Sequence, residues 1–144
     1  MAQSKSEMLN SLFTKYNLVF DKDNPNSKDN DVYIHKHYKI ITRGGIQKIE
    51  KAAGIKCDFE VINSGRDFVI LKGYGNSSSG QQYITFASAS SDSSQNPYYA
   101  EMAEKRCRSR LILTLAGLYE LGVFGEDEAD DFSASTQTAT YRKA

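Results

Sequence analysis

The middle of the chain has the composition of β-strands, and residues 56–62 alternate apolar and polar side chains as half-buried strands do. Three such stretches follow one another, at residues 56–62, 66–74 and 82–90. The segments between them, residues 63–65 and 76–80, consist of Asn, Ser and Gly, which favour tight turns. Because such short turns connect neighbouring antiparallel strands, the pattern predicts a three-stranded antiparallel meander over residues 56–90.

After the meander, apolar residues recur at intervals of three and four, which predicts a long helix from Pro97 to about Leu121. A Ser-rich loop at residues 91–96 precedes it. Pro97 suits the first turn of a helix, and we expect Gly122 and Gly125 to end it. One broad arc of this helix carries small and apolar side chains and is expected to pack on the meander: Tyr99, Ala100, Met102, Ala103, Cys107, Leu111, Leu113, Thr114, Gly117, Leu118 and Leu121.

Two shorter helices are predicted before the meander. Residues 6–18 place Met, Leu, Phe and Tyr at helical spacing, with Ser6 as the N-cap. A second helix is expected at residues 45–53, with Thr42 as its N-cap and Gly54 as the glycine that closes it. Two other segments separate these helices: a polar loop at residues 21–31 and a strand or extended segment at residues 32–42.

Length and composition indicate one globular domain. The chain has 144 residues, of which 40% are hydrophobic and 25% charged, so a packed core is expected for most of it. We expect a single domain at residues 1–132, made of an N-terminal helix and loop (1–31) and a core (32–132). The remaining residues, 133–144, are poor in apolar side chains and are expected to be disordered.

The sequence also bears on the cellular compartment. No apolar stretch approaches the length of a membrane-spanning helix, and the N-terminus lacks the apolar region of a secretory signal. Without such a signal, we expect the two cysteines, Cys57 and Cys107, to be reduced thiols. These features favour a cytoplasmic protein that does not contact a membrane.

Charged residues are segregated along the chain, although 18 basic residues balance 18 acidic ones. Two basic blocks and one acidic block stand out: Lys36, Lys39, Arg43, Lys48, Lys51 and Lys56; Lys105, Arg106, Arg108 and Arg110; and Glu120, Glu126, Asp127, Glu128, Asp130 and Asp131. Such blocks are typical of a chain that holds an anion on one surface, and equally of solvated faces of ordinary elements. The charge pattern alone leaves both interpretations open.

Arg106 and Arg110 are unusual because they project from the arc of the helix that is expected to face the sheet. Burying an unpaired guanidinium is costly. Each arginine therefore finds a carboxylate, or faces a groove that holds an anion, or faces another subunit, or extends past the sheet edge into solvent. The sequence does not choose among these four arrangements.

The second half of the chain resembles a known family. The resemblance rests on a Ser-rich segment at residues 88–94, on the acidic run at residues 126–131, and on the helical residues Tyr99, Met102, Ala103, Arg106, Arg110, Leu113, Leu115, Ala116, Gly117 and Leu118. This combination is similar to phage single-strand annealing proteins of the Rad52-like/Erf superfamily, and it covers residues 40–131. It implies an α+β fold with a Rad52-like β-β-β-α core, in which the three-stranded antiparallel meander packs against the long C-terminal helix, with additional N-terminal helices.

The same resemblance implies a function. Such a protein binds single-stranded DNA and anneals complementary strands in phage or prophage homologous recombination and DNA repair, without ATP or another cofactor, in the cytoplasm of a bacterial host cell. Because one chain of this size offers only a short groove, we expect a homo-oligomer, either a ring or a filament. Its basic blocks would meet the acidic run of the next subunit. A single-strand-binding protein or an exonuclease is a further expected partner.

A groove for single-stranded DNA needs cations along the phosphates and aromatic rings near the bases. The candidate DNA-binding residues are Lys36, Lys39, Arg43, Lys48, Lys51, Arg66, Lys105, Arg106, Arg108, Arg110, Tyr98 and Tyr99. Tyr33 and Tyr38 are interleaved with the first basic block. Every one of these tyrosines is equally compatible with a place in the core.

Catalytic and metal-binding motifs are weak. His35 and His37 have a spacing that can ligate a metal, but no Cys or acid stands at a matching spacing nearby. No glycine pair continues into the Gly-Lys-Ser/Thr of a phosphate loop. Half-exposed strands account equally well for a nuclease-like set of side chains: Asp58, Glu60, Asp67 and Lys72. We therefore expect no enzymatic activity and no metal, and the alternative to annealing is a protein–protein interaction module, for assembly or host-factor inhibition, that does not bind DNA.

Overall fold

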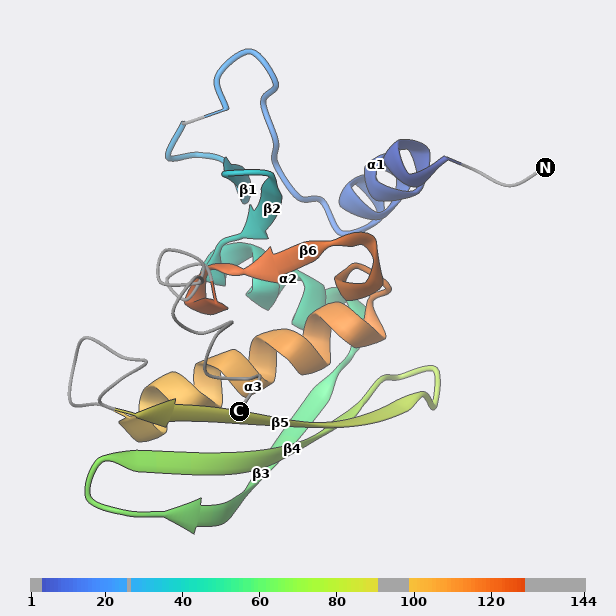
Figure 1. Ribbon diagram of the computed structural model, residues 1–144. Helices are drawn as coiled ribbons and strands as arrows, with labels where there is room; N and C mark the ends of the chain where they lie inside the picture. Colours follow the sequence, from blue (N-terminus) through green and yellow to red (C-terminus); the bar gives the residue numbers. More distant parts are fainter. Residues whose placement is uncertain (1–3, 26, 91–98, 129–144) are drawn as a thin grey trace.

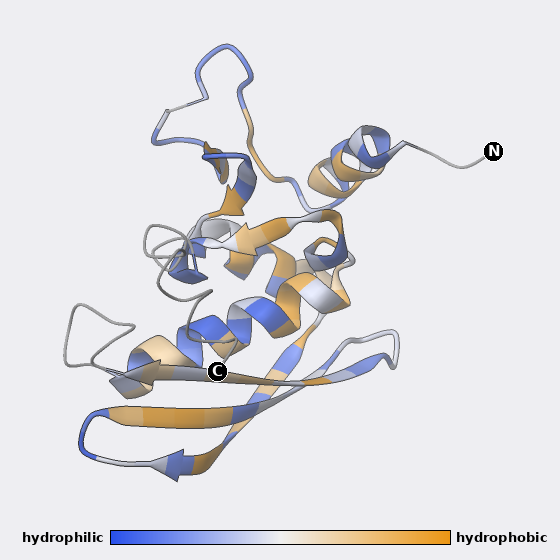
Figure 2. Cartoon of the chain, in the orientation of Figure 1, coloured by the Kyte–Doolittle hydropathy of each residue, from blue (hydrophilic) through white to orange (hydrophobic). Residues whose placement is uncertain are grey.

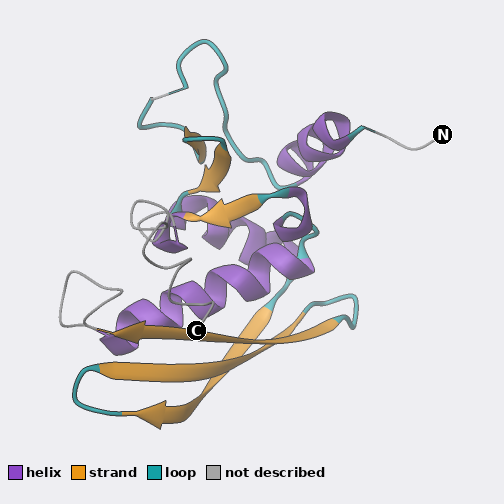
Figure 3. Cartoon of the chain, viewed as in Figure 1, coloured by secondary structure: helices purple, strands orange, loops and turns teal. Residues whose placement is uncertain are grey.

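The computed structural model describes residues 4–25, 27–90 and 99–128, which form a mixed α+β fold (Figures 1 and 3). Its helices are α1 (Lys5–Lys15), α2 (Arg43–Ala53), α3 (Tyr99–Leu115) and the 3-10 helix η1 (Tyr119–Leu121). Its strands are β1 (Val32–His35), β2 (Tyr38–Ile41), β3 (Lys56–Ser64), β4 (Phe68–Asn76), β5 (Gln82–Ser90) and β6 (Val123–Gly125). In this part of the chain the strands form two three-stranded sheets, ordered β1-β2-β6 and β3-β4-β5. None of the helices so described is long and apolar enough to cross a bilayer.

The predicted antiparallel meander is confirmed. β4 lies between β3 and β5 and is antiparallel to both, and β5 begins and ends at the predicted residues. The first turn was predicted at residues 63–65 and lies two residues later, at 65–67, because Asn63 and Ser64 still pair with β4. A bulge at Ile62 shifts the register of β3 and makes this pairing possible.

α3 packs across one face of the meander, as the change in periodicity predicted (Figure 1). Two glycines of β4 permit the close approach: a Cβ at Gly73 would lie 2.4 Å from Cys107 Sγ, and one at Gly75 would lie 3.0 Å from Leu115 Cδ1. Cys107 and Leu111 of α3 are fully buried in this layer. Small strand residues therefore set how closely the helix approaches the sheet.

The helix ends earlier than predicted, at Leu115 instead of Leu121. Gly117 adopts a left-handed conformation with φ of +81°. The Leu118 N–H donates to the Leu113 carbonyl at 2.9 Å, and the Gly117 N–H donates to Thr114 at 3.1 Å. This pair of bonds is a Schellman motif, which ends an α-helix by satisfying its last carbonyls.

The chain beyond α3 contributes a strand that the sequence analysis missed. Gly125, expected to end the helix, lies in β6, which pairs in parallel with β2. The predicted single strand at residues 32–42 is also wrong, since β1 and β2 form a hairpin. Lys36 in its turn has φ of +57°, a left-handed conformation that reverses the chain. Together these three short strands make the second sheet.

α3 is consequently buried on two sides, between the meander and the β1-β2-β6 layer with α2 (Figures 1 and 2). Cys107 and Leu111 face the meander, whereas Ile112 and Leu113 belong to the main core with Ile49 of α2. The predicted single arc was therefore incomplete, because it omitted Ile112, which is fully buried. A helix enclosed by two layers has no solvated face over much of its length.

The two N-terminal helices are present. α2 has the predicted Thr42 N-cap, whose hydroxyl accepts from the Gly45 N–H, and the predicted Gly54 at its end. For α1 the predicted cap was wrong, since Ser4 forms a capping box with Glu7. The loop at residues 21–31 contains no helix or strand among its described residues. The predicted loop at residues 91–96, Pro97 and the tail at residues 133–144 lie outside the described residues.

Candidate nucleic-acid interface

The first basic block follows the β1–β2 hairpin into α2. Lys36 lies in the hairpin turn and is exposed, and Lys39 of β2 is half-buried. Arg43 begins α2, and Lys51 lies in its last turn, where a cation is favoured by the helix dipole; both are exposed. Because β2 runs directly into α2, Lys36, Lys39 and Arg43 follow one continuous stretch of backbone.

Two cations of this block pair with acids of the chain itself. The Lys48 ammonium lies 2.6 Å from Asp31 and also donates to the Asn17 carbonyl at 3.2 Å. Arg43 lies 3.8 Å from Asp127, and its side chain remains 55% exposed. The Asp127 carboxylate is only 11% exposed, but the separation of 3.8 Å is long for an ion pair, and the Arg43 guanidinium keeps much of its surface open to solvent.

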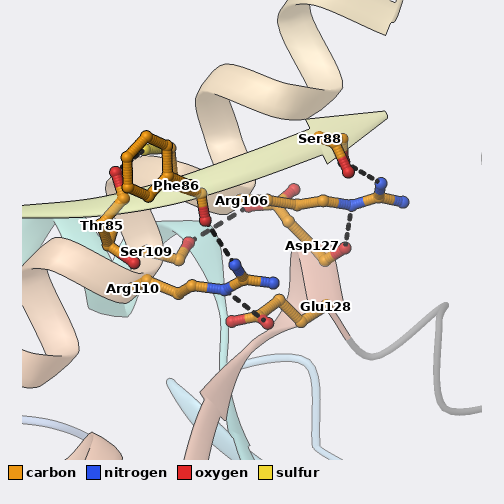
Figure 4. A network of polar contacts seen from close by, with 9 residues as sticks. Thr85, Phe86, Ser88, Arg106, Ser109, Arg110, Asp127 and Glu128 are labelled. Atoms are coloured by element: carbon orange, nitrogen blue, oxygen red, sulfur yellow. Dashed lines mark hydrogen bonds and ion pairs between the residues drawn. The ribbon is translucent and has the colours of Figure 1, made fainter. Parts of the chain in front are cut away.

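Arg106, a predicted DNA-binding residue, is buried against its own chain, with 2% of its surface exposed (Figure 4). Its Nη1 donates to the Ser88 carbonyl at 3.0 Å, and its Nε donates to the Asp127 carbonyl at 3.4 Å. In place of an open groove, the guanidinium faces main-chain carbonyls. A side chain enclosed in this way offers little surface to a phosphate.

Arg110 has the carboxylate partner that was one of the open alternatives. Its Nε donates to Glu128 at 3.1 Å, and its Nη1 donates to the Phe86 carbonyl at 2.6 Å (Figure 4). Burial lowers the pKa of Arg110, but the Glu128 carboxylate outweighs this effect and raises it. Phe86 and Ser88 belong to β5, an edge strand of the meander. The two arginines therefore satisfy outward carbonyls of that edge, which protects it from pairing with another strand.

The other cations of α3 differ in their surroundings. Arg108 bonds to Glu104 at 2.6 Å and to Glu50 at 2.8 Å, and its guanidinium lies 5.2 Å from the Phe59 ring centroid. Burial lowers the pKa of Arg108, and the hydrogen bond and charge of Glu104 raise it above the ordinary value. Lys105 is half-exposed. Arg108 thus joins α3 to α2 and β3, whereas the charge of Lys105 acts on the Asp127 carboxylate.

The acidic segment, residues 126–128, is part of the folded structure. Glu126 accepts from the Arg43 N–H at 2.6 Å, and Asp127 accepts from the Ser109 hydroxyl at 3.5 Å. Burial raises the pKa of Asp127, although Arg43 lowers it in part. The segment therefore connects the end of β6 to α2 and α3. The rest of the acidic run, residues 129–131, lies outside the described residues.

The predicted aromatic residues are dispersed. Tyr99 is half-buried and packs against a small cluster that includes Val69 and Ala103, and Tyr98 lies outside the described residues. Tyr38 is 37% exposed beside the basic hairpin, and its ring meets Phe124 edge-on at 5.4 Å. Among the predicted tyrosines that the structure describes, Tyr38 has the exposed ring, and Lys36 and Lys39 are its neighbours in the sequence. Arg66 is exposed in the turn between β3 and β4.

The sequence analysis missed the outer face of the meander, the face turned away from α3. Phe86 and Ile84 are exposed there, at 52% and 44%, and Lys72 and Tyr74 are half-exposed beside them. The available signal was that residues 68–71 of β4 are apolar at consecutive positions, and that Tyr83 of β5 lies on one face while Ile84 and Phe86 lie on the other. A strand with one face in solvent has polar side chains at every second position.

The described residues contain no metal site, and the comparisons with known proteins find no relative. Within the described residues, no group of three or more His, Cys, Asp or Glu side chains could hold a metal ion. His35 ends β1 and His37 lies in the hairpin turn, so the two do not share a strand face. Comparison of the chain with models of protein families, with curated proteins and with solved structures finds no match.

Proposed function

We propose that this protein binds single-stranded DNA and anneals complementary strands, without ATP, as a homo-oligomer related in fold to the Rad52-like annealing proteins. The observation that carries the proposal is the β3-β4-β5-α3 unit. An antiparallel meander followed by a helix across one face agrees with the arrangement that the family resemblance implied, although the helix ends at Leu115 instead of Leu121.

Accessible cations support the proposal. Lys36, Lys39 and Arg43 lie along the hairpin that enters α2, with the exposed ring of Tyr38 between them. Cations that follow a backbone, with an aromatic ring nearby, are the elements of single-strand binding without sequence preference. The DNA-contacting set proposed here is therefore Lys36, Lys39, Arg43, Lys51 and Lys105, while the buried Arg106 and the paired Arg108 and Arg110 stabilise the fold.

Annealing requires no group transfer, so its chemistry is electrostatic. Two complementary strands repel through their phosphates, and a row of lysines and arginines reduces this repulsion while the bases remain free to pair. A single hairpin and helix contact few nucleotides. Several copies arranged side by side would extend the row, which is why oligomerisation belongs to the proposal.

Salt dependence of binding tests the proposal. Anisotropy of a labelled oligothymidylate, titrated at several salt concentrations, should show affinity falling steeply with salt, and a fluorescence-quenching assay should show annealing without nucleotide. Lys36→Asn keeps a residue that tolerates positive φ, and with Lys39→Gln it should flatten the salt slope by about 0.7 for each lost phosphate contact. Lys28→Gln, an exposed lysine of the N-terminal loop, is the matched control.

The same protein, studied by sedimentation and by these binding assays, also distinguishes annealing from the alternative function, a protein–protein interaction module. Sedimentation should show an oligomer whose size changes when the oligonucleotide is added. An interaction module that does not bind DNA would give no anisotropy change at low salt and no annealing, and either outcome contradicts the proposal.

A further inference from the structure

The outer face of the meander has the composition of a contact surface. α3 is the one described element that packs broadly on the meander, and it covers the opposite face (Figure 1). Across the strands, Lys72 of β4 is opposite Phe86 of β5, and Tyr74 is opposite Ile84. We call these four residues the ring patch. An exposed Phe and Ile side by side on a sheet face indicate a surface that another molecule covers.

A lysine lies at the centre of this patch. The Lys72 ammonium is 5.3 Å from the centroid of the Tyr74 ring and 5.9 Å from that of Phe86. The Tyr74 hydroxyl donates to Glu60 at 2.7 Å, which fixes the ring. The ion pairs found among the described residues do not include Lys72. The Lys72 ammonium therefore lies near the faces of two aromatic rings and can pair with an anionic group of a bound molecule.

The central cation distinguishes between possible occupants. A second protein surface packed on the patch would have to desolvate the Lys72 ammonium, which is costly unless that surface supplies a buried carboxylate. A nucleic-acid strand supplies what the patch lacks, because a base stacks on a ring while its phosphate meets the ammonium. Aromatic side chains on the open face of a sheet bind bases in this way in other proteins.

The charges around the patch also indicate where the phosphates of a bound nucleic-acid strand would lie. Asp58 and Glu60 lie on the β3 side of the outer face and repel phosphates. On the β5 side, Ser88 and Ser90 share the same face and can donate hydroxyl hydrogen bonds. The phosphates are therefore expected to lie away from β3, near Lys72 and the serines of β5, with the bases on the Phe86 and Tyr74 rings.

We infer that the ring patch is a base-stacking site for single-stranded nucleic acid, with Phe86 and Tyr74 as the stacking rings and Lys72 as the phosphate contact. The inference rests on the proposed function and adds a second surface to it, distinct from the basic hairpin. The charge pattern of the sequence did not include any of these residues.

The chain contains no tryptophan, which permits a direct test. Phe86→Trp introduces a single indole into the patch, and stacking of a base should quench its fluorescence as oligothymidylate is added. Val61→Trp is the matched control, because Val61 is equally exposed, at 59%, but pairs with Leu71 on the other face of the sheet. Quenching at Phe86→Trp without quenching at Val61→Trp is the expected result.

Affinity supplies an independent measurement. Phe86→Ala should weaken oligothymidylate binding about fivefold or more, the change that corresponds to about 1 kcal/mol of stacking, while Val61→Ala leaves it unchanged. If wild-type protein binds but neither Phe86 variant differs from the Val61 variants, the ring patch is not the site, and the proposed function stands. If the wild type does not bind, both fail. If Phe86→Ala instead converts an oligomer into a monomer in sedimentation and leaves monomer affinity unchanged, the patch is an interface between copies, and the inference is overturned.

Discussion

The contact between α3 and β4 at Gly73 predicts a large effect from a single methyl group. A Cβ built at Gly73 would lie 2.4 Å from Cys107 Sγ and 2.9 Å from Leu111 Cδ1. Both neighbours are fully buried, and Leu111 packs between the helix and the sheet. Neither can move into solvent, so Gly73→Ala must push the helix away from the strand or force a strained rotamer.

The magnitude follows from overpacking in a close-packed core. Extra methyl groups at such sites cost about 1–3 kcal/mol, and the 2.4 Å approach at Gly73 favours the upper half of that range. For a chain of this size, each kcal/mol lowers the melting temperature by roughly 3–5 °C. Gly73→Ala should therefore lower it by about 6–15 °C, with little change in the denaturant m-value, because the same surface is exposed on unfolding.

A double-mutant cycle identifies the cause. Urea unfolding followed by circular dichroism gives the free energies of wild type, Gly73→Ala, Cys107→Ala and the double variant. Cys107→Ala alone should destabilise by about 1 kcal/mol, because it leaves a small cavity. In the Gly73→Ala background it removes the closest contact, so the double variant should be more stable than the sum of the two changes by about 1 kcal/mol or more.

The control is a glycine with space around it. A Cβ at Gly44, in the first turn of α2, meets only Thr42 Oγ1, at 3.9 Å. Gly44→Ala should leave stability unchanged or raise it by about 0.5 kcal/mol, since alanine restricts the unfolded chain. If Gly73→Ala behaves like Gly44→Ala, or if the cycle shows strict additivity, the described packing of α3 on β4 is wrong.

Two further predictions concern buried polar groups. Arg110→Ala removes the guanidinium that pairs with the Glu128 carboxylate, which is 6% exposed, and should cost about 1–3 kcal/mol in thermal unfolding. Adding Glu128→Gln should recover part of this loss, and full additivity would argue against the pair. Burial raises the pKa of the Cys57 and Cys107 thiols from 9.0 to about 11, because the folded state disfavours the thiolate. The two neutral thiols therefore contribute their full stability below pH 9.0, and this contribution is lost as the pH rises towards about 11. A variant with both cysteines replaced by alanine should therefore lose less unfolding free energy over that interval, and an identical loss would contradict the burial of the thiols.

Local signals in the sequence were sufficient where the structure is stabilised by neighbours in the chain. Thr42 and Gly54 bracket α2 because a hydroxyl satisfies the first N–H groups and a glycine adopts the left-handed conformation at the end. The limits of β5 followed from the Ser- and Gly-rich turn before it and from the Ser-rich segment after it. These features depend on a few consecutive residues, and the same residues carry the information.

Contacts between distant segments decided the remainder. Ile112 and Arg106 are buried because a second layer, built partly from β6, covers the side of α3 that a two-layer fold would leave in solvent. β6 has three residues, too few for a recognisable alternation, and it is a strand only because β2 supplies its hydrogen bonds. The partners of the α3 arginines depend on where this second layer brings the acidic segment. Residue type and spacing could predict that guanidiniums on a packed helix face need acceptors, but only the tertiary structure determined that the chain itself supplies them.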